Sequence, residues 1–504
     1  MEIHRAEIVI VGAGIAGTSA ALSALDEGRE VLILSKQVGG AGGSTRFAQG
    51  GIAYLGEDDS EDLLIEDIKR VGGEYVIPER VEILVREGVR AIEEILIRRL
   101  KVPFDSLPDG RYALGLESGH SRRRILHRGD ETGSILEQKM VEYLRGRDGV
   151  SLWKNAYVYD LIVDGKECLG CRVLYEGKDI ALLAGKVILA TGGIGDIYLY
   201  STNPKGSSGD GIALCARYGV SIRNAQFVQF HPTVFFGSTG IPLLLTEAIR
   251  GEGAYLENAY GEAFMERYAP EQRDLAPRRV VARAVFEEIR RTGKVFLNIK
   301  PVKKRLLLNL RFPFVSEMLR REGISIERED RIPVTVAQHF FCGGIETDAW
   351  GRTSLSNLYA VGECAWTGVH GWDRLASTSL LEGLVWGLRA GKDAAASFSA
   401  IPDVHPEECL CSLDRSLPAG FTREKMMRLK KMMWEYAGIE PNPDFLPMVH
   451  TEILRLRGEA EDYCRFRLDQ ELFEFRSACW VASALVSALI SEKEKPSSPL
   501  FSRF

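Results

Sequence analysis

The sequence is poor in cysteine and in long, uninterrupted apolar stretches. It has nine cysteines among 504 residues, an odd and modest number that argues against a disulfide framework. We find no uninterrupted apolar run long enough to span a bilayer. The apolar stretch over residues 7–25 contains three spaced glycines and follows several charged residues. A buried strand and helix explain it better than a signal peptide, so we expect a cytoplasmic protein.

An excess of positive charge is also lacking. The formal net charge is −6, charged residues make up 27% of the chain, and both signs are interspersed. This balance argues against a nucleic-acid partner. The length predicts about two or three domains around a large core.

Metal-ligand spacing is lacking as well. Cys168-x-x-Cys171 stands without a second pair of the same kind, in a segment from Val163 to Tyr175. We interpret this segment as a hairpin with turns at Gly165 and Gly170. Two ordinary thiols are the preferred interpretation, and we predict no metal site.

Two fragments about 350 residues apart predict a dinucleotide cofactor. The apolar strand at residues 7–11 runs into Gly12-Ala-Gly14-Ile-Ala-Gly17 and an alanine-rich stretch. Gly12 permits a tight turn, Gly14 lets backbone N–H groups approach phosphates, and Gly17 lets a helix pack on its strand. Far downstream, Leu358-Tyr-Ala-Val-Gly-Glu363 places a carboxylate where it can accept hydrogen bonds from a cofactor hydroxyl.

The residue that often binds the ribose of NAD is absent. An acidic residue commonly follows the second strand of such folds, but Ser35-Lys36 follows the strand expected at residues 31–34. This weakens an interpretation as a plain NAD enzyme, while Lys36 remains a candidate for the adenosine half of a cofactor.

Four longer motifs resemble the succinate dehydrogenase/fumarate reductase flavoprotein superfamily. They are residues 43–51 (GSTRFAQGG), 229–233 (QFHPT), 245–253 (LTEAIRGEG) and 370–382 (HGWDRLASTSLLE). Within it, residues 119–127 (GHSRRRILH) followed by Asp130-Glu-Thr-Gly133 are similar to the L-aspartate oxidase family. The resemblance covers about residues 7–490.

The resemblance implies an α/β FAD-binding (Rossmann-like) domain with an inserted α+β capping domain and a C-terminal helical bundle. A composition shift after residue 224 and the return of sheet-like sequence suggest the boundaries. We expect the FAD-binding domain at 1–224 and 341–404, the capping (substrate) domain at 225–340, and the helical domain at 405–504.

The resemblance also implies noncovalent FAD. Covalently flavinylated relatives carry a histidine before threonine in the glycine-rich loop, and this chain has Ser44 there. The predicted cofactor-binding residues are Gly12, Gly14, Ile15, Ala16, Gly17, Lys36, Ser44, Thr45, Arg46, Phe47, Ala48, Gln49, Gly50, Gly51, Asp210, Glu363, Ser379 and Leu380.

A dicarboxylate substrate needs two anion sites, for which the planar fork of arginine is well suited. By resemblance, Arg374 binds one carboxylate with His339, and His231, Thr246 and Glu247 belong to the motifs that bind the other end. The alternatives are a surface ion pair for Arg374 and a core histidine for His231. The run Arg122 to Arg124 is interpreted as solvated or ion-paired rather than as a substrate clamp.

Two further residues bear on the reaction. Arg278 matches the proton-transfer arginine of the family, although its high pKa makes arginine a poor base. The family usually has aspartate next to it, where this chain has Arg279. Glu117 matches a glutamate of aspartate oxidases and would face the substrate ammonium; the alternative is a solvated loop residue.

The resulting hypothesis is FAD-dependent oxidation of L-aspartate to iminoaspartate. Oxygen would be reduced to hydrogen peroxide, or fumarate to succinate, in quinolinate and NAD biosynthesis, with a quinolinate synthase as a candidate partner. One alternative is a soluble fumarate reductase or succinate dehydrogenase-type flavoprotein. Another is a non-catalytic FAD-binding scaffold, which Arg279 and a divergent C-terminal tail keep open.

Overall fold

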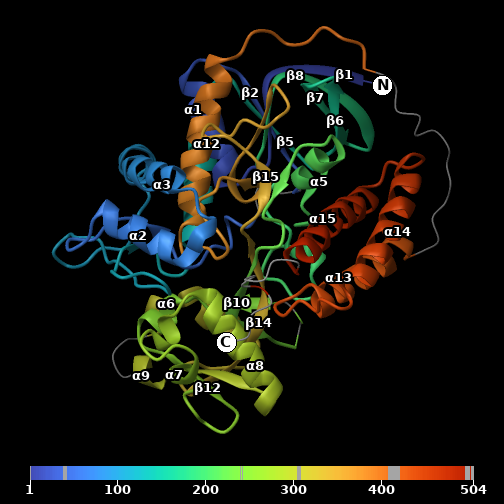
Figure 1. Cartoon of the computed structure of the whole chain (residues 1–504). Coiled ribbons are helices and arrows are strands. Elements are labelled where there is room, and N and C mark those ends of the chain that lie inside the picture. The colour runs from blue at the N-terminus through green and yellow to red at the C-terminus, as the bar shows by residue number, and fades with distance from the viewer. Residues whose placement is uncertain are drawn as a thin grey trace.

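A computed structural model describes residues 2–37, 43–238, 240, 242–303, 308–406, 420–493 and 500. Figure 1 shows a large α/β part, a second part below it that contains β12 and α8, and three C-terminal helices at the side.

The α/β part is built on a seven-stranded sheet. Its strands are β1 (Glu2–Val11), β2 (Val31–Ser35), β5 (Val150–Lys154), β6 (Ala156–Asp164), β7 (Glu167–Tyr175), β8 (Lys178–Leu189) and β16 (Leu358–Ala360). The order is β5-β2-β1-β8-β7-β6, and β16 also pairs with β8. β1 is parallel to β2 and β8, β2 to β5, and β16 to β8, while β6 and β7 add an antiparallel extension.

The register of the parallel strands brings the two distant fragments together. Val11 pairs with Leu189, and Leu189 pairs with Ala360. The carboxyl ends of β1, β8 and β16 therefore lie at one edge of the sheet, which is where open α/β sheets bind ligands. Gly12 follows β1 and Glu363 follows β16, so both residues lie at this edge.

Two helices cover this sheet side by side (Figure 1), namely α1 (Ile15–Asp26) and α12 (Ser379–Ala396). They pack closely because glycines replace side chains at their contact. A Cβ atom at Gly387 would lie 2.4 Å from the carbonyl oxygen of Ala16, and one at Gly391 would lie 2.1 Å from that of Ala20. Residue numbers increase in the same direction along both helices at these contacts, so the N-termini of α1 and α12 point the same way.

The second part is a five-stranded sheet with short helices. Its strands, in the order β11-β10-β14-β13-β12, are β10 (Val228–Phe236), β11 (Pro242–Leu244), β12 (Tyr255–Asn258), β13 (Val295–Asn298) and β14 (Arg331–Phe341). The helices are α6 (Ala248–Gly251), α7 (Met265–Tyr268), α8 (Arg278–Thr292), α9 (Lys300–Lys303), α10 (Leu308–Arg311) and α11 (Pro313–Arg321). α8 packs on β10 and β14, so its first turn lies over their side chains.

The C-terminal helices are α13 (Phe421–Tyr436), α14 (Leu446–Cys464) and α15 (Gln470–Lys493). α15 packs on α14, on α13 and on α5 (Asp210–Arg217). By length and composition α15 could cross a membrane, but 67% of its apolar window is buried inside the protein. A core helix has the same apolar character on all sides.

The remaining elements connect these parts. The helical ones are α2 (Glu61–Gly72), α3 (Pro78–Ala91), α4 (Thr132–Arg145), the π-helix η2 (Ile92–Arg99), and the 3₁₀ turns η1 (Gly73–Tyr75), η3 (Gly195–Ile197), η4 (Arg273–Leu275) and η5 (Gly362–Cys364). The short strands are β3 (Ile52–Ala53), β4 (Ile125–Leu126), β9 (Ile222–Arg223), β15 (Gly344–Glu346) and β17 (Ala365–Trp366).

One expectation about the cysteine hairpin is wrong. Gly165 lies in the turn between β6 and β7, but Gly170 lies within β7. A Cβ atom at Gly170 would lie 2.1 Å from the carbonyl oxygen of Leu182, so this glycine allows close strand contact rather than a turn. Cys168 and Cys171 are both buried in the same hydrophobic core.

Candidate active site

The predicted cofactor and substrate residues meet in one cavity of about 360 Å³. It is lined by every predicted cofactor residue except Gly17, Arg46 and Gly50. It is also lined by four of the predicted substrate residues, which are Glu117, Arg278, His339 and Arg374. A molecule that fills this cavity can therefore contact both sets.

The three exceptions lie outside the lining for different reasons. Gly17 faces the turn, since a Cβ atom there would lie 2.0 Å from the carbonyl oxygen of Gly12. Arg46 is exposed and lies 3.9 Å from Glu137. Gly50 lies against the Glu117 carboxylate and so bears on the substrate side.

The glycine-rich turn fits a pyrophosphate. Gly12 has φ of +116°, and a Cβ atom there would lie 2.2 Å from the carbonyl oxygen of Ala190. α1 begins directly afterwards without a side-chain cap at Gly14. The Ile15 N–H donates to Oγ1 of Thr45 at 3.0 Å, which leaves other N–H groups of the first turn for an anion.

Glu363 provides a buried acceptor at the same edge. Its Oε1 accepts the backbone N–H of Phe341 at 3.0 Å. Burial raises the pKa of Glu363 to about 7. A hydroxyl donor on a bound dinucleotide would stabilise the ionised carboxylate here.

We expect Glu363 to make the apoprotein less stable as the pH rises. Because the folded pKa is about 7 against an ordinary 4.5, the folded chain keeps a proton that the unfolded chain has lost. The free energy of unfolding should fall by about 3 kcal/mol across that interval. Thermal melting of the apoprotein between pH 5 and 8 would measure this, and Glu363→Gln should flatten the profile. An equally steep profile in that variant would contradict the assignment.

Lys36 and Asp210 line the cavity as an ion pair. Nζ of Lys36 lies 2.6 Å from Oδ2 of Asp210 and 3.3 Å from Oε1 of Glu474 on α15. Burial lowers the pKa of Lys36, but these two carboxylates outweigh it and raise the pKa. The Tyr157 hydroxyl donates to Oδ1 of Asp210 at 2.8 Å, so the pair is held on both sides. Glu474 is a contact that the sequence pattern did not indicate.

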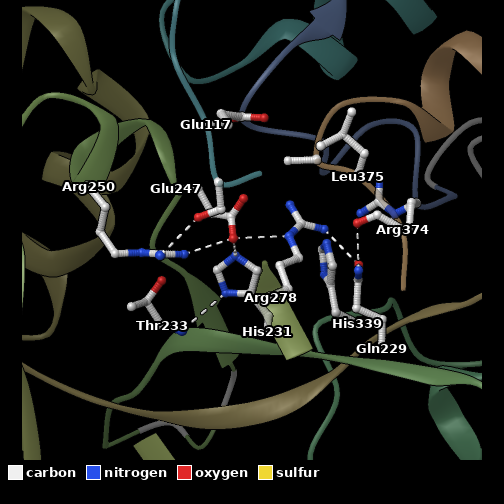
Figure 2. Close-up of polar contacts among 12 residues, drawn as sticks. Glu117, Gln229, His231, Thr233, Glu247, Arg250, Arg278, His339, Arg374 and Leu375 are labelled. Carbon is white, nitrogen blue, oxygen red and sulfur yellow. Dashed lines mark hydrogen bonds and ion pairs between the residues drawn. The ribbon is translucent and has the colours of Figure 1, made fainter. Parts of the chain in front are cut away.

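Arg278 belongs to a buried row of charged groups (Figure 2). Its Nε lies 3.1 Å from Oε1 of Glu247, and Nη2 of Arg250 donates to the same oxygen at 2.8 Å. Burial raises the pKa of Glu247, but the two arginines outweigh it and hold the pKa at about 2. Burial lowers the pKa of Arg278, and Glu247 more than reverses this. Arg278 therefore keeps its positive charge at neutral pH.

Arg374 reaches the cavity from the loop that precedes α12. Its Nη1 donates to Oγ of Ser379 at 2.8 Å, and its guanidinium lies 4.3 Å from the ring centroid of Phe340. Nε of Arg374 is buried and donates to none of the residues described by the structure. Burial and the charge of Arg278 lower the pKa of Arg374 to about 10. A protonated donor is thus left for a ligand.

His231 and His339 lie side by side, with ring centroids 5.0 Å apart. Nδ1 of His231 accepts the backbone N–H of Thr233 at 3.2 Å, which places the ring proton on Nε2, 4.0 Å from Glu247. Nδ1 of His339 shares a hydrogen bond of 2.7 Å with the Thr202 hydroxyl. Burial and a nearby arginine lower the pKa of both rings well below the ordinary value. Both are neutral near pH 7.

Glu117 is almost fully buried, with 2% of its surface exposed. Its Oε2 accepts the Ser377 hydroxyl, and its Oε1 lies 2.0 Å from where a Cβ atom of residue 50 would be. Burial and the charge of Glu247 raise the pKa of Glu117. The structure thus places it in the cavity rather than on a solvated loop, as a stronger base than a surface glutamate.

The remaining predicted positions lie near the site without lining it. Thr246, His231 and Glu247 are buried but do not line the cavity. Oγ1 of Thr246 accepts the backbone N–H of Ala248 at 3.3 Å. In the charge run, Arg124 is fully buried and ion-paired with Asp59 and Asp67, which agrees with the ion-paired interpretation.

Two residues of the site were present in the motifs but received no role. Arg250 lies three residues after Glu247, a spacing that places both side chains on one face of a helical turn. Gln229 lies two residues before His231 on β10, and strand alternation places both on one face. The spacing could have indicated both.

Residues 7–380 match the FAD binding domain family. The chain is similar to the L-aspartate oxidase of Halobacterium salinarum, with 42% identity over 489 residues that cover 96% of this chain and 93% of that protein. It is 35% identical to L-aspartate oxidase 1 of Ralstonia nicotianae, over 97% of this chain and 93% of that protein.

The chain belongs to the L-aspartate oxidase family.

Solved structures place this family member within a wider fold. The E. coli quinol fumarate reductase chain FrdA superposes with a TM-score of 0.86 at 25% identity, covering 98% of this chain and 90% of that one. The predicted fold class and FAD as the cofactor are confirmed by these matches. The domain boundaries at 224/225, 340/341 and 404/405 stay a prediction.

We expect the flavin of this family member to be released by acid. Ser44 lines the cavity at the position where the resemblance implies a histidine in covalently flavinylated relatives, and a serine hydroxyl forms no such bond to the flavin. Acid precipitation should leave yellow FAD in the supernatant, measured by absorbance and mass. Flavin that stays on the precipitated protein would contradict noncovalent binding.

Proposed function

We propose that the chain oxidises L-aspartate to iminoaspartate with FAD as cofactor, passing the electrons to oxygen or to fumarate. The observation that carries this proposal is a carboxylate, Glu117, in the same cavity as the two arginines Arg278 and Arg374. The names of the relatives support it. The two arginines suit the two carboxylates of the substrate. The basic carboxylate of Glu117 suits the amine that distinguishes aspartate from succinate.

Charge complementarity supports dicarboxylate binding. Arg374 keeps a free buried donor, and the neutral ring of His339 lines the same cavity. Arg278 supplies a second cation whose charge is sustained by Glu247. Glu247 is ionised and paired, so we assign it to holding Arg278 and Arg250 rather than to contacting the substrate.

The amine end is assigned to Glu117. In this proposal its carboxylate accepts a hydrogen bond from the substrate ammonium and then takes one of its protons, for which a raised pKa is an advantage. FAD, when bound, supplies the two-electron acceptor. Arg278 stabilises negative charge on the substrate carboxylate during this step and need not act as a base.

The cellular setting is part of the same proposal. Iminoaspartate would feed quinolinate and NAD biosynthesis, with a quinolinate synthase as the consumer of an unstable product. A cytoplasmic location is supported by the seven cysteines of the described ranges, none of which forms a disulfide.

The test is anaerobic mixing of the oxidised holoenzyme with L-aspartate while flavin absorbance is followed. L-aspartate should bleach the flavin, and succinate at the same concentration should do so far more slowly. Faster bleaching by succinate would favour a fumarate reductase or succinate dehydrogenase-type enzyme. Bleaching by neither would favour the non-catalytic scaffold.

A further inference from the structure

We propose that Asp373 is a positioning residue that acts through Gln229 to fix the catalytic guanidinium of Arg278 relative to Arg374. Resting on the proposed function, this inference assigns a role to a carboxylate that is not itself part of the cavity lining. It also explains how the chain functions with arginine at position 279.

The contacts form an unbroken path. Oδ1 of Asp373 accepts Nε2 of Gln229 at 2.6 Å, and the same Nε2 donates to the Arg374 carbonyl oxygen at 2.8 Å. Oε1 of Gln229 accepts Nη1 of Arg278 at 2.9 Å. Figure 2 shows Gln229 between the two arginines. Asp373 and Gln229 are each only 2% exposed, so water does not compete for these bonds.

The side-chain amide of Gln229 can make these hydrogen bonds in only one orientation. The amide nitrogen of Gln229 faces two acceptors, a carboxylate and a carbonyl, and its oxygen faces a cation. A flipped amide would set oxygen against both acceptors and an N–H group against the guanidinium. Asp373 and the Arg374 carbonyl therefore set which way the amide points, and the amide oxygen in turn fixes Arg278.

Arg279 joins the same carboxylate from α8. Its backbone N–H donates to Oδ2 of Asp373 at 3.1 Å, and its guanidinium lies 5.3 Å from the ring of Trp372. Oδ2 of Asp373 thus holds the first turn of α8, and Oδ1 holds the Gln229 side chain on β10. The resemblance implies an aspartate at the position of Arg279; in this chain the carboxylate that meets the first turn of α8 is that of Asp373.

This arrangement predicts an unusual pattern in a double-mutant cycle. In Asp373→Asn only one side-chain oxygen remains for two donors, the Gln229 amide and the Arg279 backbone N–H. The NH₂ group of the new asparagine must then face one of these donors. We expect kcat/KM for aspartate to fall on the order of tenfold or more. Arg279→Asp alone sets a second carboxylate beside the buried carboxylate of Asp373 and should also lower kcat/KM by about tenfold or more.

The double variant Arg279→Asp with Asp373→Asn moves the carboxylate from one side of the contact to the other. A carboxylate at position 279 lies in the first turn of α8, where helix N-termini favour negative charge. We expect recovery to within about threefold of wild-type kcat/KM, where independent effects would multiply to about a hundredfold loss. A double variant as poor as the product of the single losses would overturn the proposal.

Three readouts keep the result separate from folding and from the proposed function. FAD content should match wild type throughout the cycle, and every variant should still melt in one cooperative transition. Asp160→Asn, which breaks a remote contact with Arg217, should leave kcat/KM unchanged. Dissociation constants for succinate, followed by flavin absorbance, should show the same loss and recovery. Absence of aspartate oxidation in wild type would refute the proposed function only, since succinate binding still tests Asp373. Unchanged succinate binding and activity in Asp373→Asn would overturn the positioning role.

Discussion

Arg374→Ala is expected to lower kcat/KM for L-aspartate by on the order of a hundredfold or more. The variant removes a buried cation whose Nε is directed to no partner among the described residues and so is kept for a ligand. A substrate carboxylate in a desolvated cavity would lose charged hydrogen bonds, which cost about 2–5 kcal/mol. Steady-state peroxide formation at varied aspartate concentration would measure the loss.

The cofactor should remain bound in this variant. Arg374 contacts Phe340 and one predicted cofactor residue, Ser379, while the pyrophosphate turn and Glu363 lie on other elements. A matched control is Arg389→Ala on α12, whose guanidinium pairs with Glu87 outside the cavity and should leave kcat/KM unchanged. If Arg374→Ala kept nearly normal kcat/KM with full FAD, Arg374 would not bind the substrate carboxylate.

The cofactor half of the site could be predicted from the sequence because strand order has simple rules. Gly12 and Glu363 each follow an apolar stretch of a parallel strand, and parallel strands end at a common edge. Those two local patterns were therefore enough to place residues 350 positions apart in one cavity. Gly170 shows the limit of the same reasoning, since a glycine in a strand can serve close packing as well as a turn.

The substrate half was predicted from motifs and not from geometry. Arg278 and Arg374 line the cavity, but no periodicity shows that Gln229 bridges them. That bridge depends on how β10, α8 and the loop before α12 pack, which is a tertiary property. Asp373 was missed for this reason, and Arg279 looked like an uncompensated change because its partner is 94 residues away.

Glu117→Gln is expected to separate aspartate oxidation from fumarate reduction. Glutamine keeps the size of the side chain and can still accept the Ser377 hydroxyl. It has no negative charge to hold the substrate ammonium, and it cannot take a proton from it. Aspartate oxidation should therefore fall by on the order of a hundredfold or more.

Fumarate has no amine and depends on the arginines and histidines alone. Its reduction by chemically reduced Glu117→Gln enzyme should persist within about tenfold of wild type, a barrier change of about 1.4 kcal/mol. Ser377→Ala is the matched control, because it frees the carboxylate without removing its charge and should cost aspartate oxidation less than Glu117→Gln does. Equal loss of both reactions would make Glu117 structural. Loss of neither would place it outside the chemistry, and the fumarate reductase interpretation would then gain.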